Sequence, residues 1–237
     1  MISASGLVAN CGYQRLLKRN KPRSEKLEYA AGRGTTFHAS VERWVRDGIV
    51  PLVEDLEIQG WIDLLASQWT PPPGIKTEIA WGLSPDGDHV MVQEPRPHEY
   101  ESMNGRPLLT AGRADAVWPG IVGHFPCVGA PTAYVATVYV IDWKTGKWPV
   151  TPARENLQAN AGGIALAKRY GARAYVPGIY YARDGYFDWG EPVELGSIDH
   201  AARFVDVTMA AELDETPRPG EWCYSCWERR NCTAAQP

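Results

Sequence analysis

The stretch Val138-Tyr139-Val140-Ile141-Asp142-Trp143-Lys144-Thr145-Gly146 decides the fold, because the rest of the chain is arranged around the strand that it predicts. Its β-branched and aromatic run is typical of a strand, and Thr145-Gly146 predicts a turn. Side chains alternate between the faces of a strand, so Asp142 and Lys144 point the same way at its end. A carboxylate that binds a divalent metal, beside an ammonium that orients water, suits phosphodiester hydrolysis. Taken alone, the two residues would be better explained as a surface ion pair on an edge strand, because such pairs are common.

The composition of the 237 residues, 44% hydrophobic and 22% charged, is that of a single soluble globular domain. No apolar run reaches transmembrane length, and the N-terminus lacks the apolar segment of a signal peptide. We therefore expect a cytoplasmic protein with no membrane partner. The formal net charge of −4 argues against a protein that coats DNA, but not against an enzyme with a local basic groove.

Apolar periodicity and turn residues predict the order of the elements. Helices are expected over 3–20, from a glycine-containing turn at Gly32 and Gly34 to Val45, and over 56–69, 152–170 and 198–212. Strands are expected over 75–83, 89–92, 108–118, 138–144, 174–182 and 186–189, with 119–132 as a long hairpin tip. This order predicts an α/β fold with a mixed, mostly antiparallel sheet flanked by helices.

A metal site at the end of the organising strand needs a second acidic residue nearby, and Asp115 on the preceding strand supplies it. Antiparallel pairing through the hairpin would place Asp115 opposite Asp142, and two such carboxylates can hold one divalent cation. Hard oxygen ligands of this kind suit Mg²⁺ or Mn²⁺. Taken singly, His38 fits a core-edge histidine, Gln158 a solvated helix residue and Glu78 a solvated strand residue.

Four motifs follow one another along the chain: Gly34-Thr35-Thr36-Phe37-His38, Gly112-Arg113-Ala114-Asp115, Ile141-Asp142-Trp143-Lys144-Thr145-Gly146, and Gln158 on the following helix. In kind and order they resemble the motifs of the PD-(D/E)xK nucleases, specifically the RecB-like iron–sulfur exonuclease branch that includes CRISPR-associated adaptation nucleases and phage relatives. Together, each on its expected element, they are much more specific than any one of them.

The resemblance implies a restriction-endonuclease-like fold forming one nuclease domain over residues 1–237. It also implies that His38, Asp115 and Asp142 hold the Mg²⁺ or Mn²⁺, that Lys144 assists the attacking water, and that Gln158 lies near the lysine. One position departs from the family pattern. A tyrosine often follows the glutamine by four residues, and this chain has Gly162 there, which leaves Tyr170 and Tyr181 as candidates for its place.

Cysteines form a second constellation. The C-terminal segment contains a Cys-x2-Cys-x5-Cys run, Cys11 lies near the other end, and Cys127 lies in the hairpin tip. Three close thiolates and a distant one fit an iron–sulfur cluster. Zinc is the alternative metal, although structural zinc sites usually use two close cysteine pairs. An odd cysteine count without an export signal argues against disulfides.

The same nuclease branch carries this cysteine arrangement, so the resemblance implies a 4Fe-4S cluster with Cys127 left unligated. The cluster would join residues 1–20 to residues 215–237 through Cys11, Cys223, Cys226 and Cys232.

The function implied by the resemblance is a divalent-metal-dependent deoxyribonuclease that hydrolyses phosphodiester bonds at DNA ends, in recombination, repair, phage DNA processing or CRISPR adaptation. Its partners would be DNA with single-stranded ends and proteins of a recombination or integration complex, in the host cytoplasm if a phage encodes it. An exonuclease is favoured over an endonuclease because the compact chain has no evident second DNA-recognition module. The alternative is a catalytically weak DNA-binding or scaffold subunit of a larger nuclease or integration complex. The intact set of His38, Asp115, Asp142 and Lys144 argues against that alternative.

Overall fold

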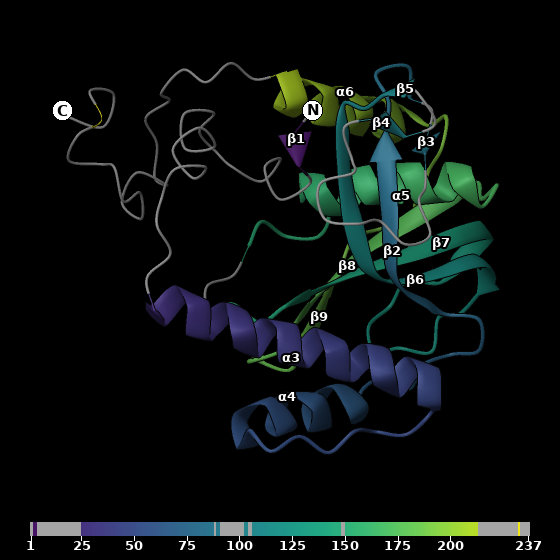
Figure 1. Ribbon diagram of the computed structural model, residues 1–237. Coiled ribbons are helices and arrows are strands. Elements are labelled where there is room, and N and C mark those ends of the chain that lie inside the picture. The colour runs from purple at the N-terminus through teal and green to yellow at the C-terminus, as the bar shows by residue number, and fades with distance from the viewer. Residues whose placement is uncertain are drawn as a thin grey trace.

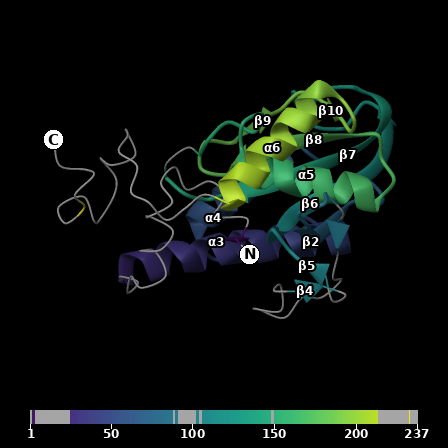
Figure 2. The same ribbon diagram turned by 90° about the horizontal axis from the view of Figure 1, so that it is seen from above.

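The computed structural model describes residues 2–3, 25–87, 89–90, 102–103, 106–147, 150–212 and 232. In this part of the chain a sheet lies between two layers of helices (Figure 1, Figure 2). Helices α3 (Glu25–Asp47) and α4 (Leu56–Ala66) cover one face, and α5 (Leu157–Arg169) and α6 (Ile198–Glu212) cover the other. The helix predicted over 3–20 lies almost wholly outside the described residues.

The sheet has eight strands, six of which follow the order β10-β8-β7-β6-β2-β3, while β1 pairs with β6 and β9 with β8. Its members are β1 (Ile2–Ser3), β2 (Lys76–Leu83), β3 (His89–Val90), β6 (Thr110–Gly123), β7 (Ala133–Lys144), β8 (Ala174–Tyr181), β9 (Tyr186–Trp189) and β10 (Val193–Glu194). The short strands β4 (Ser102–Met103) and β5 (Arg106–Pro107) pair separately. Among the strand pairs of the described residues, only β7–β8 and β1–β6 are parallel, so the predicted mixed, mostly antiparallel sheet flanked by helices is confirmed.

Strand β7 separates the two hydrophobic cores by its alternation. Ile141 and Trp143 pack into the core beneath α3 and α4, whereas Val138 and Val140 pack into the core beneath α5 and α6. Asp142 therefore has the parity of the face that α5 covers. The alternation predicted for the organising stretch is confirmed.

Helix α5 lies very close to the sheet because its buried side is made of small residues. An added methyl at Gly163 would lie 2.2 Å from a ring carbon of Tyr175 on β8, so a larger residue would force the helix away. The helix begins at Asn156, whose side chain accepts a hydrogen bond from the Ala159 amide at 3.1 Å. This cap, rather than Pro152, sets the helix start. The predicted start was therefore five residues too early, and Gln158 lies in the first turn.

The turn predicted at Gly32 and Gly34 is wrong, since α3 runs through both glycines without interruption. Glycine costs about 1 kcal/mol relative to alanine within a helix. At Gly34, however, an added methyl would lie 2.8 Å from Thr145 Oγ1, so the glycine allows α3 to approach the turn after β7. The close packing of α3 against Thr145 therefore explains a glycine that the sequence pattern alone had assigned to a turn.

The hairpin between β6 and β7 is shorter than predicted. Strand β6 continues through Pro119 to Gly123, because the pairing with β7 shifts register between Trp118 and Ile121 and accommodates the proline there. The connecting loop folds inward. The backbone of Cys127 in this loop forms an isolated antiparallel β-bridge with Trp69, which follows the end of α4. The predicted bounds of β9 and α6 agree with the structure. Among the described helices, none is long and apolar enough to cross a membrane.

Candidate metal centre

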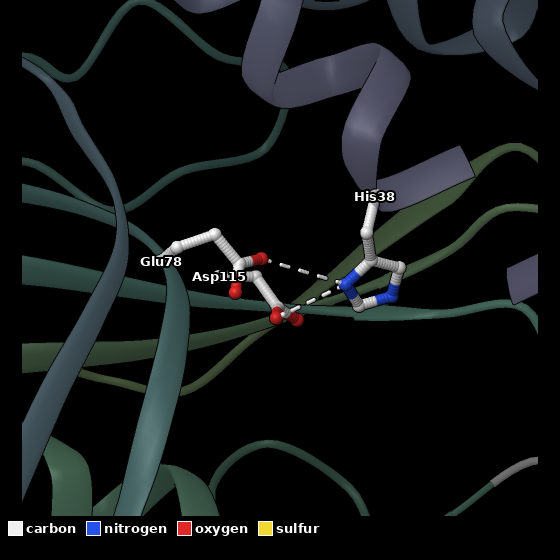
Figure 3. A group of neighbouring side chains, drawn as sticks. All are labelled: His38, Glu78 and Asp115. Carbon is white, nitrogen blue, oxygen red and sulfur yellow. Dashed lines mark ion pairs between the residues drawn. The ribbon is translucent and has the colours of Figure 1, made fainter. Parts of the chain in front are cut away.

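Three elements bring a histidine and two carboxylates together beneath α3. His38 Nδ1 lies 3.2 Å from Asp115 Oδ1 on β6 and 3.9 Å from Glu78 Oε1 on β2 (Figure 3). One ligand atom of each residue lies within 4.8 Å of the others. An imidazole nitrogen and carboxylate oxygens at this spacing form a donor set that fits a divalent cation.

The register of the sheet explains why the acidic residues converge. The flanking pairs Thr77 with Ala116 and Ile79 with Ala114 place Glu78 opposite Asp115. On the other side of β6, the pair Ala116 with Ile141 continues to Asp115 with Asp142. Three carboxylate residues therefore occupy one row across β2, β6 and β7, which we call the acidic row (Glu78, Asp115 and Asp142).

Glu78 is the member of the acidic row that the sequence interpretation placed in solvent. Its φ of +54° is the only positive φ of a non-glycine residue in the described part of the chain. Such a conformation costs of the order of 1–3 kcal/mol and is concentrated at functional sites. The Glu78 carboxylate also pairs with Arg113 at 3.0 Å. The residue pattern of a strand does not predict a positive φ. Glu78 could have been identified from the sequence only through the pairing of its strand with the strand of Asp115.

Asp115 lies at the centre of the row and is buried. Its Oδ1 contacts His38, and its Oδ2 accepts a hydrogen bond of 2.6 Å from the Trp143 amide of β7. The carboxylate therefore connects α3, β6 and β7. Because both of its oxygens have charged or strongly polar partners, Asp115 is held in one orientation.

Asp142 is buried as well and pairs with Lys144 from the same strand. The Lys144 ammonium forms an ion pair with Asp142 Oδ2. Gln158 Nε2 approaches Asp142 Oδ1 from α5 at 3.5 Å, the outer limit for a hydrogen bond. Burial raises the pKa of Asp142, the charge of Lys144 lowers it, and the charge of Asp115 raises it, with a net upward shift.

His38 is an imidazolium in the metal-free protein. Burial by itself lowers its pKa, but hydrogen bonds and charge interactions with Asp115 and Glu78 prevail and raise the pKa from 6.5 to about 10. With His38, Arg113 and Lys144, three cations then balance the three carboxylates of the acidic row. A bound divalent cation would take over part of this balance.

An open cleft of about 570 Å³ gives access to this centre. It lies between α3 and the strands, and its lining includes Gly34, Thr35, His38, Glu78, Arg113 and Thr145. The α3 side of the cleft is lined mostly by small residues, which leave it open. Of the metal-ligand candidates, His38 and Glu78 are therefore reachable from solvent through the cleft.

The residues selected from sequence as the catalytic set gather at one place. His38, Asp115, Asp142, Lys144 and Gln158 form a connected chain of contacts. Gly162 is at the position where the nucleases that the chain resembles often have a tyrosine. Trp81 of β2 occupies the space beside it, since an added methyl at Gly162 would lie 3.1 Å from Trp81 Nε1.

Of the two tyrosines proposed for that place, Tyr181 lies near the site and Tyr170 lies at the far end of α5. Tyr181 pairs with Lys144 in the sheet, and the Tyr181 hydroxyl donates to the Val150 carbonyl at 3.3 Å. Burial, foremost, and the charge of Asp142, among other neighbours, raise the pKa of Tyr181.

The predicted cluster ligands Cys11, Cys223 and Cys226 lie outside the described residues, and the fourth, Cys232, is partly buried. Cys127 is a buried free thiol, and burial raises its pKa to about 12. Such a thiol is a poor metal ligand and nucleophile at neutral pH.

Comparisons with known proteins found no family model and no curated protein that matches the chain. Among solved structures, the chain is similar to the crystal structure of SSO0001, with a TM-score of 0.46 and 13% sequence identity, over 100% of this chain and 87% of that chain.

Proposed function

We propose that this protein is a divalent-metal-dependent deoxyribonuclease that hydrolyses phosphodiester bonds at DNA ends. The observation that carries the proposal is the convergence of His38, Glu78 and Asp115 beside an open cleft, with the Asp142–Lys144 ion pair on the adjacent strand β7. The order of the motifs along the chain supports a restriction-endonuclease-like fold of the RecB-like iron–sulfur branch. The proposed setting is recombination, repair, phage DNA processing or CRISPR adaptation.

The donor set fits Mg²⁺ or Mn²⁺ in kind. In our proposal His38, Asp115 and Asp142 hold the cation. Glu78 is a further ligand, because its carboxylate forms one close group of ligand atoms with His38 and Asp115. The cation would polarise the phosphate and supply an activated water. Lys144, Gln158 and Arg113 would surround this cation, each with a different role.

Lys144 is the residue we assign to the attacking water and the phosphate charge. Its ammonium is held against Asp142 at the strand end, so it is oriented before substrate arrives. Gln158 approaches the other oxygen of Asp142 and restricts the rotation of that carboxylate. Arg113 lies at the cleft beside Glu78, where a guanidinium suits contact with a DNA phosphate.

The first prediction concerns cleavage. Lys144→Ala and Asp142→Asn should each reduce Mg²⁺- or Mn²⁺-dependent degradation of end-labelled DNA by at least about 100-fold, because a preorganised charge at the reacting phosphate is lost. Arg169→Ala is the matched control. It removes one positive charge from the exposed last turn of α5 and should leave the rate unchanged.

Substrates with free and blocked ends, single- and double-stranded, separate end degradation from internal cleavage. Equal rates for wild type and Lys144→Ala at the same folded fraction would contradict the catalytic assignment and favour a scaffold subunit.

The second prediction follows from the raised pKa of His38. A folded-state pKa of about 10 against 6.5 means that the ion pairs of His38 stabilise the metal-free fold fully below pH 6.5. That stabilisation is lost as the pH rises from 6.5 through 10. In urea unfolding with EDTA, the stability advantage of wild type over His38→Ala should therefore shrink between pH 6 and pH 10.

The exposed His124, in the loop after β6, provides the control, and His124→Ala should show no such trend. An advantage of wild type over His38→Ala that stays constant or grows with pH would contradict the imidazolium assignment.

We also propose that a 4Fe-4S cluster held by Cys11, Cys223, Cys226 and Cys232 joins the two ends of the chain. The third prediction is that anaerobically purified protein contains about four irons per chain and absorbs broadly in the visible range. Cys11→Ser should lose the iron, whereas Cys127→Ser should keep it, because Cys127 is buried in the core beneath α3 and α4. Stoichiometric zinc without iron or sulfide would overturn the cluster, and iron loss in Cys127→Ser would overturn the ligand assignment.

A further inference from the structure

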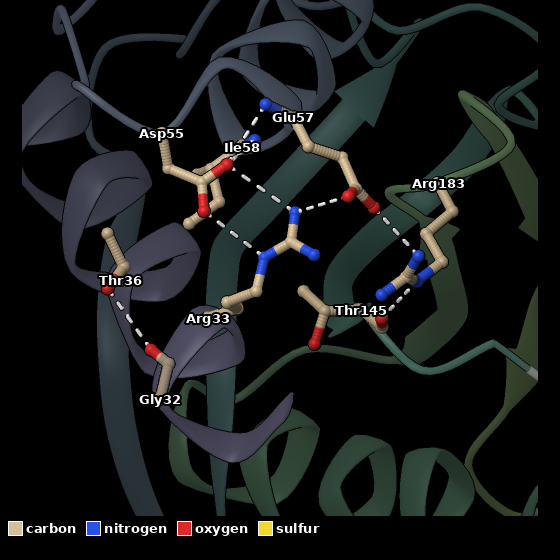
Figure 4. Close-up of polar contacts among 8 residues, drawn as sticks. All are labelled: Gly32, Arg33, Thr36, Asp55, Glu57, Ile58, Thr145 and Arg183. Carbon is tan, nitrogen blue, oxygen red and sulfur yellow. Dashed lines mark hydrogen bonds and ion pairs between the residues drawn. The ribbon is translucent and has the colours of Figure 1, made fainter. Parts of the chain in front are cut away.

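Two arginines from distant parts of the chain share one carboxylate next to the candidate metal centre. Glu57, in the first turn of α4, contacts one arginine with each of its carboxylate oxygens, at 2.8 Å in both cases (Figure 4). Its Oε2 pairs with Nη2 of Arg33 on α3, and its Oε1 accepts a hydrogen bond from Nη1 of Arg183. Arg183 comes from the turn between β8 and β9. Both guanidinium carbons lie 4.8 Å from the ring centroid of the buried Trp61. We call Arg33, Glu57, Trp61 and Arg183 the arginine clamp.

The clamp is anchored to α4 by a further acid. Asp55 caps α4 by accepting hydrogen bonds from the Glu57 and Ile58 amides, and its other oxygen pairs with Arg33 Nε at 3.3 Å. The Arg33 side chain is only 13% exposed, so it is largely enclosed by its neighbours. Arg33 therefore has a fixed place relative to α4.

The other end of the clamp reaches the strand that carries Lys144. Arg183 Nε donates a hydrogen bond of 2.9 Å to the Thr145 carbonyl, directly after Lys144. The neighbouring Ala182 amide donates to the Lys144 carbonyl, also at 2.9 Å. On its far side, Thr145 lies against α3 at Gly34. The end of β7 is thus held between the clamp and the helix that carries His38.

The two parts of the candidate metal centre depend on this arrangement. His38 lies on α3, five residues after Arg33, whereas Asp142 and Lys144 lie at the end of β7. Arg183 spans the two parts, because one of its nitrogens binds the β7 end while another reaches Arg33 through Glu57. A planar guanidinium makes the two contacts from separate nitrogens in a fixed geometry, whereas a lysine ammonium has a single nitrogen and no such fork.

We propose that Arg183 and Glu57 are positioning residues that fix the end of β7 against α3 and thereby set the spacing of His38 and Lys144. This inference rests on the proposed function for its catalytic consequence, but not for its structural one. Glu57 is 48% exposed, so its ion pairs should contribute little to global stability. Their effect is on local geometry.

The test compares Arg183→Ala, Arg183→Lys and Glu57→Gln in the full-length protein. Mn²⁺ affinity, measured by the EPR signal of free Mn²⁺, should fall about tenfold in all three, as for other residues that orient a metal site from outside the ligands. In DNA cleavage, kcat should fall while KM for DNA changes little. Amide hydrogen exchange should accelerate at Trp143 and Ala182, whose bonds hold the end of β7.

Arg46→Ala is the matched control, because Arg46 is an exposed arginine of α3, the helix that also carries Arg33, and its ion pair is a local one with the neighbouring Asp47. It should leave Mn²⁺ affinity, kcat and exchange unchanged. Restoration of Mn²⁺ affinity by Arg183→Lys would overturn the inference, since charge alone would then suffice. Unchanged affinity and unchanged exchange in Arg183→Ala would also overturn it.

The readouts separate this inference from the nuclease proposal. Mn²⁺ binding without DNA cleavage in wild type would refute the nuclease, while the affinity series would still decide the role of the clamp. If wild type bound no Mn²⁺, exchange at Trp143 and Ala182 would decide alone, and normal exchange in Arg183→Ala would refute the clamp.

Discussion

The buried carboxylate of Asp115 is the interaction on which the arrangement of the site depends. One oxygen contacts the His38 imidazole of α3, and the other accepts the Trp143 amide of β7, so a single side chain connects three elements. Charge-assisted hydrogen bonds of this kind are roughly twice as strong as neutral ones. Loss of the carboxylate would leave the His38 imidazolium and the Trp143 amide without their shared partner. Asp115 therefore stabilises the arrangement of these elements, in addition to the metal-binding role that we propose for it.

A row of three carboxylates, two of them buried and Glu78 partly exposed, is unfavourable unless positive charge is supplied. In the metal-free protein that charge comes from His38, Lys144 and Arg113. His38 and Arg113 line the cleft, where a divalent cation or a DNA phosphate could replace or engage them. Removing one partner from such a network leaves an uncompensated buried charge, which is costly. The same electrostatics thus link the stability of the fold to the chemistry that we propose for it.

Much of this site could be predicted from the sequence because it follows from strand alternation. The pairing of Asp142 with Lys144 and the approach of Asp115 across the hairpin are consequences of period two and antiparallel pairing. Glu78 was missed because its left-handed backbone breaks that period. The path of α3 through Gly34 depends on Thr145, more than a hundred residues away, and the arginine clamp joins three segments by contacts that no local pattern encodes.

The most direct test of the account is the position of Mn²⁺ in crystals of the protein, located by its anomalous scattering. Our account predicts one strong peak between His38 Nδ1 and the carboxylate of Asp115, bounded by the other two members of the acidic row. The Glu78→Gln variant should weaken that peak. Mn²⁺ bound only elsewhere, with His38 still hydrogen-bonded to Asp115, would contradict the assignment of this centre as the metal site.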